Sequence, residues 1–478
     1  MSRHRAIALL LVLQAAYLVF MLVFGRFIAG DEIAYKAAGR EWARSGTFAA
    51  PELRGYAAWL DPEHPERLGR GFAPPIYTFS FGLFVKLVGF NPITNVAYDA
   101  LIHLALGWAT FALARALAPD LAYGYAVATA VATLPLGVPG RPDELGAVLA
   151  MFGSAVLLRA VTTKRAVIAG VLFGLAAGTS LVSLVLGVWP LLAFLREKRL
   201  GLLIAFGIVT ATAFGIVMMP MVIIMPDGIA QLSRHAGDSV RSTYAYAFAN
   251  GWRYGRHHYL SALAGMLVAA AGLFQAFRSR TVGSWMALWG PPLVALAVLV
   301  AMVPTKHYYF WMIVPSLYAA AAVTLAALRW PRFVWVSLVA LVALVWLAAA
   351  SRFALTSTIR ATLPPDQRMQ HNLRVIHKLV PSGAGVLTYD FWPALMNTHE
   401  TYSTDAAFPP WEQIDYVILT GNGSGAPGKP QTLLPEQQRY VDEHYTVIQD
   451  HLNRTPFRIG PLTTNSAWGY GPLILKRK

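Results

Sequence analysis

Two pairs of neighbouring acids stand at the edges of apolar runs. Asp31 and Glu32 follow directly on the first run, and Asp143 and Glu144 open a later one. A carboxylate at the mouth of a helical bundle can take a proton from an incoming hydroxyl group or help to hold a divalent cation. The same residues are typical helix starts, because an acid in the first turn complements the helix dipole. Both interpretations stay open at each pair, and one residue can serve both purposes.

Basic side chains at the edges of other runs could bind an anion. Lys306 and His307 open a run rich in aromatic residues, where a cation could neutralise a phosphate or simply lie among lipid headgroups. Two further candidates for a phosphate are Arg70 and Arg141, and the candidates for contacts with a second substrate are Glu144, Arg253, Arg256, His257 and His258. Gln14 and His103 lie inside apolar runs, where we expect them to be hydrogen-bonded. No P-loop, GxGxxG after a strand, HExxH or GxSxG occurs, so a soluble nucleotide donor has no visible binding motif.

The composition indicates an integral membrane protein. Of 478 residues, 56% are hydrophobic and only 13% are charged, with a mean hydropathy of +0.49, whereas a soluble domain is about 25% charged. There is no cysteine, which excludes a disulfide scaffold. The net charge of +15 could suggest nucleic acid, but residues 356–478 carry 11 basic against 10 acidic residues. The excess therefore lies in the membrane part, where loop Lys and Arg set orientation, and no nucleic-acid partner is predicted.

The apolar runs predict about eleven transmembrane helices plus interfacial helices. The runs are residues 6–29, 96–114, 121–138, 145–158, 166–195, 200–219, 259–277, 285–303, 308–328 and 333–353. The run 166–195 is too long for one upright span, and Gly178-Thr179-Ser180 could be a turn between two short helices. Residues 75–89 would reach only ~22 Å of a ~30 Å core, which favours an interfacial helix. This arrangement places 13 basic residues inside and 2 in short outer loops, with the N-terminus cytoplasmic.

The domain prediction is a membrane domain over residues 1–355 followed by a soluble α/β domain over 356–478. Within the first, residues 30–72, with helix-compatible 32–44, and residues 220–258 form two long outer loops. In the second, strands are expected at 385–388, 416–420, 445–449 and 473–475, and helices at 370–380 and 436–444. The predicted fold class is an α-helical polytopic membrane protein with a small C-terminal α/β domain on the outer side.

Three motifs, in this order and spacing, resemble the GT-C class of membrane glycosyltransferases, in particular bacterial relatives of the aminoarabinose and protein O-mannosyl transferases. The first is Gly30-Asp-Glu-Ile-Ala-Tyr with Gly39-Arg-Glu-Trp-Ala-Arg-Ser-Gly behind it, which is similar to the acidic motif and first juxtamembrane helix of that class. The second is Ala73-Pro-Pro-Ile-Tyr, and the third is Arg141-Pro-Asp with the later stretch 304–315. The resemblance covers roughly residues 6–330. Many relatives carry Lys directly before the double proline, where this chain has Ala73.

The resemblance implies a polyprenyl-phosphate-linked sugar as donor and transfer to an acceptor hydroxyl on the outer face of a bacterial inner membrane. It implies a catalytic aspartate in the first outer loop, which corresponds to Asp31. We expect Asp31 to act as the general base, with Glu32 and Asp143 orienting the acceptor or the sugar. Asp31 and Asp143 would hold Mg²⁺ or Mn²⁺ if a metal is used. In the absence of Lys at position 73, Arg70 or Lys306 would contact the phosphate. The acceptor, whether lipid, glycan or protein, is not implied, because the C-terminal domain has no recognised counterpart.

Other functions stay open at this point. A flippase or transporter for lipid-linked saccharides would share the membrane architecture, although such proteins usually show internal repeats and polar groups near midspan, and neither is evident here. A ligase or polymerase that uses diphosphate-linked oligosaccharides would share the outward site. A scaffold that binds cell-wall polymer would tolerate loss of every acid named above.

Overall fold

The computed structural model describes residues 2–24, 32–48, 74–133, 141–224, 259–302, 312–328, 365–388, 391, 395, 398–402, 409–420, 433–452, 457–459, 462–464 and 471–478. Within them, four helices are long and apolar enough to cross a membrane: Arg3–Val23, Ile93–Leu117, Leu200–Pro220 and Val282–Leu299. Several shorter apolar helices lie between these. The chain is therefore an α-helical polytopic membrane protein with a small C-terminal sheet, as predicted. The predicted number of spans stays a prediction, because the run 333–353 lies outside the described residues.

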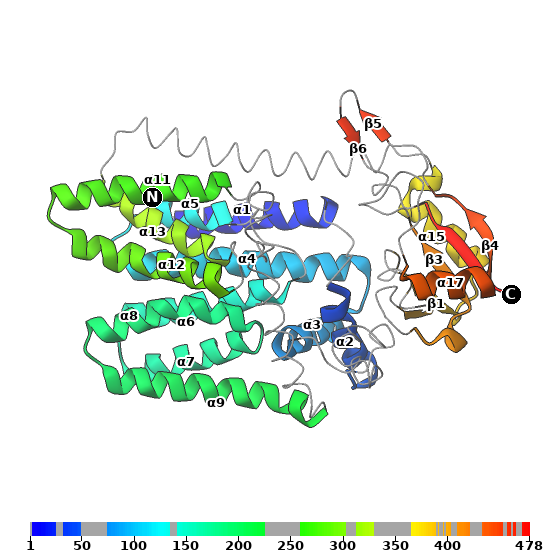
Figure 1. Ribbon diagram of the computed structural model, residues 1–478. Helices are drawn as coiled ribbons and strands as arrows, with labels where there is room; N and C mark the ends of the chain where they lie inside the picture. The colour runs from blue at the N-terminus through cyan, green and yellow to red at the C-terminus, as the bar shows by residue number, and fades with distance from the viewer. Residues whose placement is uncertain are drawn as a thin grey trace. The chain divides into compact units, whose positions relative to one another are not determined.

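The helical elements, in chain order, are α1 (Arg3–Phe24), α2 (Glu32–Ser45), α3 (Pro75–Val88), α4 (Pro92–Leu117), α5 (Tyr123–Thr133), α6 (Pro142–Arg159), α7 (Thr163–Ala177), η5 (Leu181–Gly187), α8 (Val188–Arg196), α9 (Leu200–Ile224), α11 (Tyr259–Arg278), α12 (Val282–Met302) and α13 (Val314–Ala327) (Figure 1).

By their contacts the residues divide into two compact units. The first unit contains α1 as far as Val23, the residues Pro74–Tyr77, and the helical residues from Ala97 to the end of α13. The second holds α2, the remainder of α3 with the start of α4, and the C-terminal elements. The predicted boundary at 355/356 lies outside the described residues.

The long apolar run breaks where the glycine predicted a turn. α7 ends at Ala177, Gly178 and Thr179 form a turn, and η5 and α8 follow. α7 begins after Thr162, whose side chain accepts a hydrogen bond from the backbone N–H of Arg165 and so caps the helix. The short helices on either side of the break pack on α6, which lies against α7, η5 and α8.

α7 and α9 approach each other closely through glycines. Gly170, Gly174 and Gly178 recur every fourth residue, and a Cβ atom built on them would lie 2.9, 2.5 and 2.5 Å from side chains of α9, namely those of Val209, Ala213 and Val217. Small residues at this spacing let membrane helices pack without a side-chain layer between them. No residue in the most apolar stretch of α9 is buried within the structure, as expected of a helix whose other side faces lipid.

Tryptophan side chains make hydrogen bonds between the helices that follow. Trp189 of α8 donates from Nε1 to Ser316 Oγ of α13 at 2.7 Å, and Trp289 of α12 donates to Thr324 Oγ1 of the same helix at 2.8 Å. Such interhelical hydrogen bonds hold membrane helices in register where the hydrophobic effect between them is weak. α13 therefore receives a polar contact from each of two neighbours.

In the second unit, α2 and α3 form a tightly packed helix pair. A Cβ atom on Gly39 would lie 2.4 Å from Thr78 O, and one on Gly82 would lie 2.5 Å from Gly39 O, so only glycine fits at the crossing. Trp42 of α2 packs on Phe79 with ring centroids 4.6 Å apart. Both helices are where the sequence predicted them. α3 has 14 residues, which span only ~21 Å, and its interfacial placement stays a prediction.

Within the second unit, the C-terminal elements form an α/β structure, which we call the C-terminal α/β unit. They are η7 (Pro365–Gln367), α15 (Met369–Leu379), β1 (Gly385–Thr388), β2 (Glu400–Tyr402), η8 (Trp411–Gln413), β3 (Tyr416–Leu419), α17 (Pro435–His444), β4 (Tyr445–Asp450), β5 (Phe457–Ile459), β6 (Leu462–Thr464) and β7 (Leu473–Arg477). The main sheet has the order β2-β1-β3-β7-β4, with β1 parallel to β2 and β3, and β7 antiparallel to β3 and β4. All predicted strands and helices of this unit are present.

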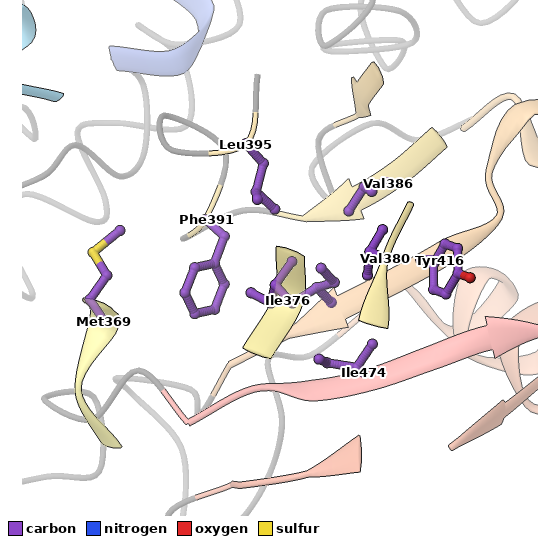
Figure 2. Close-up of a cluster of buried hydrophobic side chains, with 9 residues drawn as sticks. Met369, Ile376, Val380, Val386, Phe391, Leu395, Tyr416 and Ile474 are labelled. Carbon is purple, nitrogen blue, oxygen red and sulfur yellow. The ribbon is translucent and has the colours of Figure 1, made fainter. Parts of the chain in front are cut away.

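The core of this unit lies on both sides of the sheet. Every residue of β1 and β3 is buried, as expected of central strands covered on both faces. One cluster joins α15 to the sheet, and its labelled side chains in Figure 2 are Met369, Ile376, Val380, Val386, Phe391, Leu395, Tyr416 and Ile474. A second cluster joins α17 to the sheet through Val441, Tyr445 and Leu387. The segment therefore has a hydrophobic core of its own.

Candidate functional site

Polar side chains gather in the first unit where α3 and α6 begin and the long run breaks. We call this group the acid cluster: Tyr17, Tyr77, Asp99, His103, Arg141, Asp143, Glu144 and Ser180. Each of the four Asp, Glu and His side chains is at most 4% exposed. Charges are costly inside a membrane bundle, and they usually have a functional reason to be there.

α6 supplies the centre of the acid cluster. The helix begins at Pro142, with Asp143 and Glu144 in its first turn, as the helix-start interpretation predicted. Proline is favoured at a first turn, and acids there complement the helix dipole. The two acids nevertheless have different neighbours, and the helix start alone does not account for their burial.

Asp143 is held through both carboxylate oxygens. Arg141 Nε donates to Asp143 Oδ2 at 3.0 Å, and Ser180 Oγ donates to Oδ1 at 2.6 Å. Ser180 stands directly after the break that ends α7. Charge-assisted hydrogen bonds from two sides fix the orientation of this carboxylate, which suits it to orienting a bound group.

Glu144 faces α4 instead. His103 Nε2 lies 3.0 Å from Glu144 Oε2, and His103 Nδ1 lies 2.9 Å from the hydroxyl of Tyr17 in α1. The other carboxylate oxygen, Glu144 Oε1, is buried and makes no hydrogen bond to any residue that the structure describes. Three helices, α1, α4 and α6, thus meet at one buried His–Glu contact.

Asp99 lies one turn before His103 on α4, so both side chains lie on the same face of the helix. The hydroxyl of Tyr77, in the first turn of α3, is 3.5 Å from Asp99 Oδ1. The backbone N–H of Ile76 donates to Gly178 O at 3.4 Å. The beginning of α3 therefore contacts both α4 and the turn directly before Ser180.

Most of the remaining sequence-predicted site residues lie outside the described part of the chain: Asp31, Arg70, Arg253, Arg256, His257, His258, Lys306 and His307. Glu32 is the first residue of α2, and its side chain lies outside the description too. Of the predicted residues, the structure brings together Arg141, Asp143 and Glu144. Among the residues that the structure describes, no group of three His, Asp or Glu could hold a metal ion. The Mg²⁺ or Mn²⁺ site at Asp31 and Asp143 stays a prediction.

Asp99 was not among the predicted site residues, although Asp99 and His103 stand four residues apart in an apolar run, a spacing that places both on one helical face. The buried charges of α2 were not predicted either. Lys36 is fully buried, with Nζ 5.4 Å from the ring centre of Phe81, and Arg40 is 5% exposed. Their four-residue spacing was visible, but only the packing of α2 on α3 identifies the buried face.

Glu41 on α2 is an ionised carboxylate in a mostly cationic setting. Burial favours its neutral form, but Arg44 donates to both of its oxygens at 3.1 Å and Arg40 lies 3.4 Å away. The net effect is that the pKa of Glu41 is lowered. Between Lys36 and Arg44 the helix therefore carries three cationic side chains and one ionised carboxylate, that of Glu41.

The comparisons with known proteins bear on the fold. No model of a known protein family matches the sequence, and no curated protein matches it. ArnT from Cupriavidus metallidurans, solved with bound undecaprenyl phosphate, is similar with a TM-score of 0.56 and 12% identity over 99% of this chain and 98% of ArnT. The apo state of the same protein gives a TM-score of 0.55 and 14% identity over 98% of each chain. The arabinofuranosyltransferase AftD from mycobacteria gives 0.51 and 14% identity, covering all of this chain and 40% of AftD.

The fold is thus that of the GT-C membrane proteins, as the sequence motifs predicted. The similarity to ArnT extends over nearly the full length of both chains, so it includes the C-terminal segment that follows the membrane helices.

Proposed function

We propose that the protein is a glycosyltransferase that moves a sugar from a polyprenyl-phosphate carrier to an acceptor hydroxyl on the outer face of the membrane. The observation that carries the proposal is the similarity over nearly the full length of both chains to ArnT, whose structure holds undecaprenyl phosphate. The acid cluster supports it, because buried and oriented carboxylates at one end of a helical bundle are suited to binding a sugar. The acceptor is a lipid, a glycan or a protein.

In the proposed reaction, the acceptor hydroxyl attacks the anomeric carbon of the donor sugar. A C–O bond to the acceptor forms as the C–O bond to the phosphate breaks, and polyprenyl phosphate leaves. Asp31 takes the proton of the hydroxyl, and Lys306, His307 and Arg70 neutralise the departing phosphate. Arg141 is a weaker candidate for this contact, because its Nε donates to Asp143. Asp143 orients the bound sugar or acceptor, together with Glu32.

The proposed orientation has the N-terminus in the cytoplasm and the C-terminal α/β unit outside. The support is the excess of Lys and Arg in the loops assigned to the inside. Transfer would then take place where the headgroup of a flipped carrier lipid is accessible. The polyprenyl tail would stay between apolar helices, and α3 is a candidate wall for it.

The test is transfer of labelled sugar from polyprenyl-phosphate sugar by the purified full chain in detergent. Asp31→Asn should lower turnover by about 10²- to 10⁴-fold, because it removes the general base without changing the size of the side chain. Asp120→Asn is the matched control, since Asp120 is exposed in the turn after α4. An Asp31→Asn variant that keeps more than a tenth of the activity would exclude Asp31 as the base.

The same assay separates the alternatives. A flippase or transporter gives no glycosylated product in detergent, where there are no two compartments to move a lipid between. A ligase or polymerase would require a diphosphate-linked oligosaccharide in place of the monophosphate donor. Mass spectrometry of lipid that co-purifies with the protein identifies the carrier independently of turnover.

A further inference from the structure

The buried contact between His103 and Glu144 is not used by the proposed chemistry. We propose that His103 is a positioning residue that fixes Glu144, and through it the first turn of α6, so that Asp143 and Arg141 stay aligned for transfer. The inference rests on the proposed function, since alignment matters only if the acid cluster binds a substrate. It adds α1 and α4, through Tyr17 and His103, to the parts of the chain that determine turnover.

The two contacts of the His103 ring favour one tautomer. The ring of His103 lies between the hydroxyl of Tyr17, 2.9 Å from Nδ1, and the carboxylate of Glu144, 3.0 Å from Nε2. When the tyrosine hydroxyl donates to Nδ1, the ring proton is on Nε2, which faces the carboxylate. In that tautomer the Nε2 proton is directed at Glu144, and the three side chains join α1, α4 and α6.

Two contacts from different elements hold the first turn of α6. Asp143 and Glu144 are consecutive, and consecutive helical residues point about 100° apart. Ser180 holds Asp143 from the turn after α7, and His103 holds Glu144 from α4. A single anchor would let the first turn of α6 rotate about its contact, whereas two anchors on different elements fix it.

A contribution to the stability of the fold does not by itself explain why His103 and Glu144 are buried together. His103 and Glu144 are each 1% exposed, and a buried polar pair, like a buried ion pair, can often be replaced by packed apolar residues without loss of stability. Glu144 Oε1 also makes no hydrogen bond within the described residues, which adds a penalty that an apolar side chain would not have. The pair is therefore better explained by what it aligns than by what it stabilises.

The experiment compares His103→Leu, Glu144→Leu and the double variant His103→Leu/Glu144→Leu in the full chain. Each single change leaves one buried polar partner, so both should lower the melting temperature. The double variant should regain most of that loss because its apolar side chains can pack against each other. Its kcat should nevertheless stay about 10- to 100-fold below wild type, while its KM for the polyprenyl-phosphate sugar changes by less than about threefold.

Two conservative variants and one control complete the set. His103→Gln and Tyr17→Phe keep most of the side-chain volume, and each should lower kcat with little change in melting temperature. Gln14→Leu removes another buried contact between α1 and α4, from Gln14 Nε2 to Leu104 O at 3.2 Å, but does not reach α6, so its kcat should equal that of wild type.

The outcomes distinguish failure of this inference from failure of the proposed function. A double variant with wild-type kcat shows that the pair is only structural and overturns the inference. If the double variant does not fold, wild-type kcat in both His103→Gln and Tyr17→Phe overturns it instead. A wild-type chain without any transfer activity contradicts the proposed function itself, whatever the variants do.

Discussion

Ser180 donates a hydrogen bond of 2.6 Å to Asp143, although 37 residues separate the two along the chain. Ser180 is the first residue after the turn that ends α7, and Asp143 is in the first turn of α6. If the run 166–195 were one continuous helix, residue 180 would remain inside it. The break therefore has a consequence beyond topology, because it places a hydroxyl donor at the acid cluster.

Replacing Ser180 by Ala should lower turnover about tenfold. The change leaves Asp143 Oδ1 without its donor, which frees the carboxylate to rotate about its contact with Arg141 and costs about 1 to 3 kcal/mol of stability. Steady-state transfer and a thermal melt in detergent measure the two effects. Ser154→Ala is the control, because the buried hydroxyl of Ser154 only donates to Ala150 O of its own helix. Full activity in Ser180→Ala would show that the orientation of Asp143 does not limit the reaction.

Replacing Gly174 by Ala should destabilise the packing of α7 on α9. The new Cβ would lie 2.5 Å from Ala213 Cβ and 2.7 Å from Thr210 O, so the helices would have to separate, at a cost of about 1 to 3 kcal/mol. The same substitution at Gly207 on α9 is the control, because a Cβ there meets no atom within 4 Å. Thermal unfolding in detergent compares the two variants, and equal melting temperatures would contradict the close approach.

The proposed orientation can be tested by cysteine labelling, which is simple because the chain contains no cysteine. Glu197→Cys lies in the turn between α8 and α9, and Glu443→Cys lies on α17; both positions are exposed. In intact cells, a membrane-impermeant maleimide should label position 443 and leave position 197 unlabelled until the membrane is opened. The reverse result would invert the topology and place transfer on the other face.

The C-terminal α/β unit should lose stability in mild acid. Burial lowers the pKa of His399 from its usual 6.5. The hydrogen bond that His399 Nε2 donates to Val380 O at 3.3 Å opposes this shift, and the neighbouring His377 adds to it, so the net direction of the pKa shift is downward. Below pH 6.5 the unfolded chain binds a proton at this position that the folded unit excludes, so stability falls as the pH drops toward the folded-state pKa. Hydrogen exchange of α15 and β1 at pH 7.5 and 5.5, corrected for intrinsic rates, measures the change. His399→Asn should remove this part of the pH dependence; an unchanged pH dependence would assign it to other groups.

Much of this fold follows from local patterns. The length of the apolar runs predicted α1, α4, α9 and α12, and the glycine at 178 predicted the break. In the C-terminal α/β unit, buried strands such as β1 and β3 are short continuous apolar runs between turn residues, which are visible without any tertiary information. β2, β5 and β6 were missed because each has three residues, too few for a period to show.

The acid cluster could be predicted only in part. Asp143 and Glu144 were evident, since acids after a proline at the start of an apolar run are conspicuous. Their partners were not, because His103 and Ser180 come from elements whose contacts with α6 depend on how the bundle packs. Sequence spacing places residues on a face of one helix, but it does not tell which helix that face meets.

The length of α7 is fixed by its two ends. Its glycines match residues of α9 on one side, and Ser180, just beyond its last turn, must meet Asp143. Inserting or deleting one residue within the helix would rotate everything beyond it by about 100°, so the chain would lose either the fit to α9 or the serine contact. Relatives that keep this site should therefore vary in length at the connection between α8 and α9, and not inside α7.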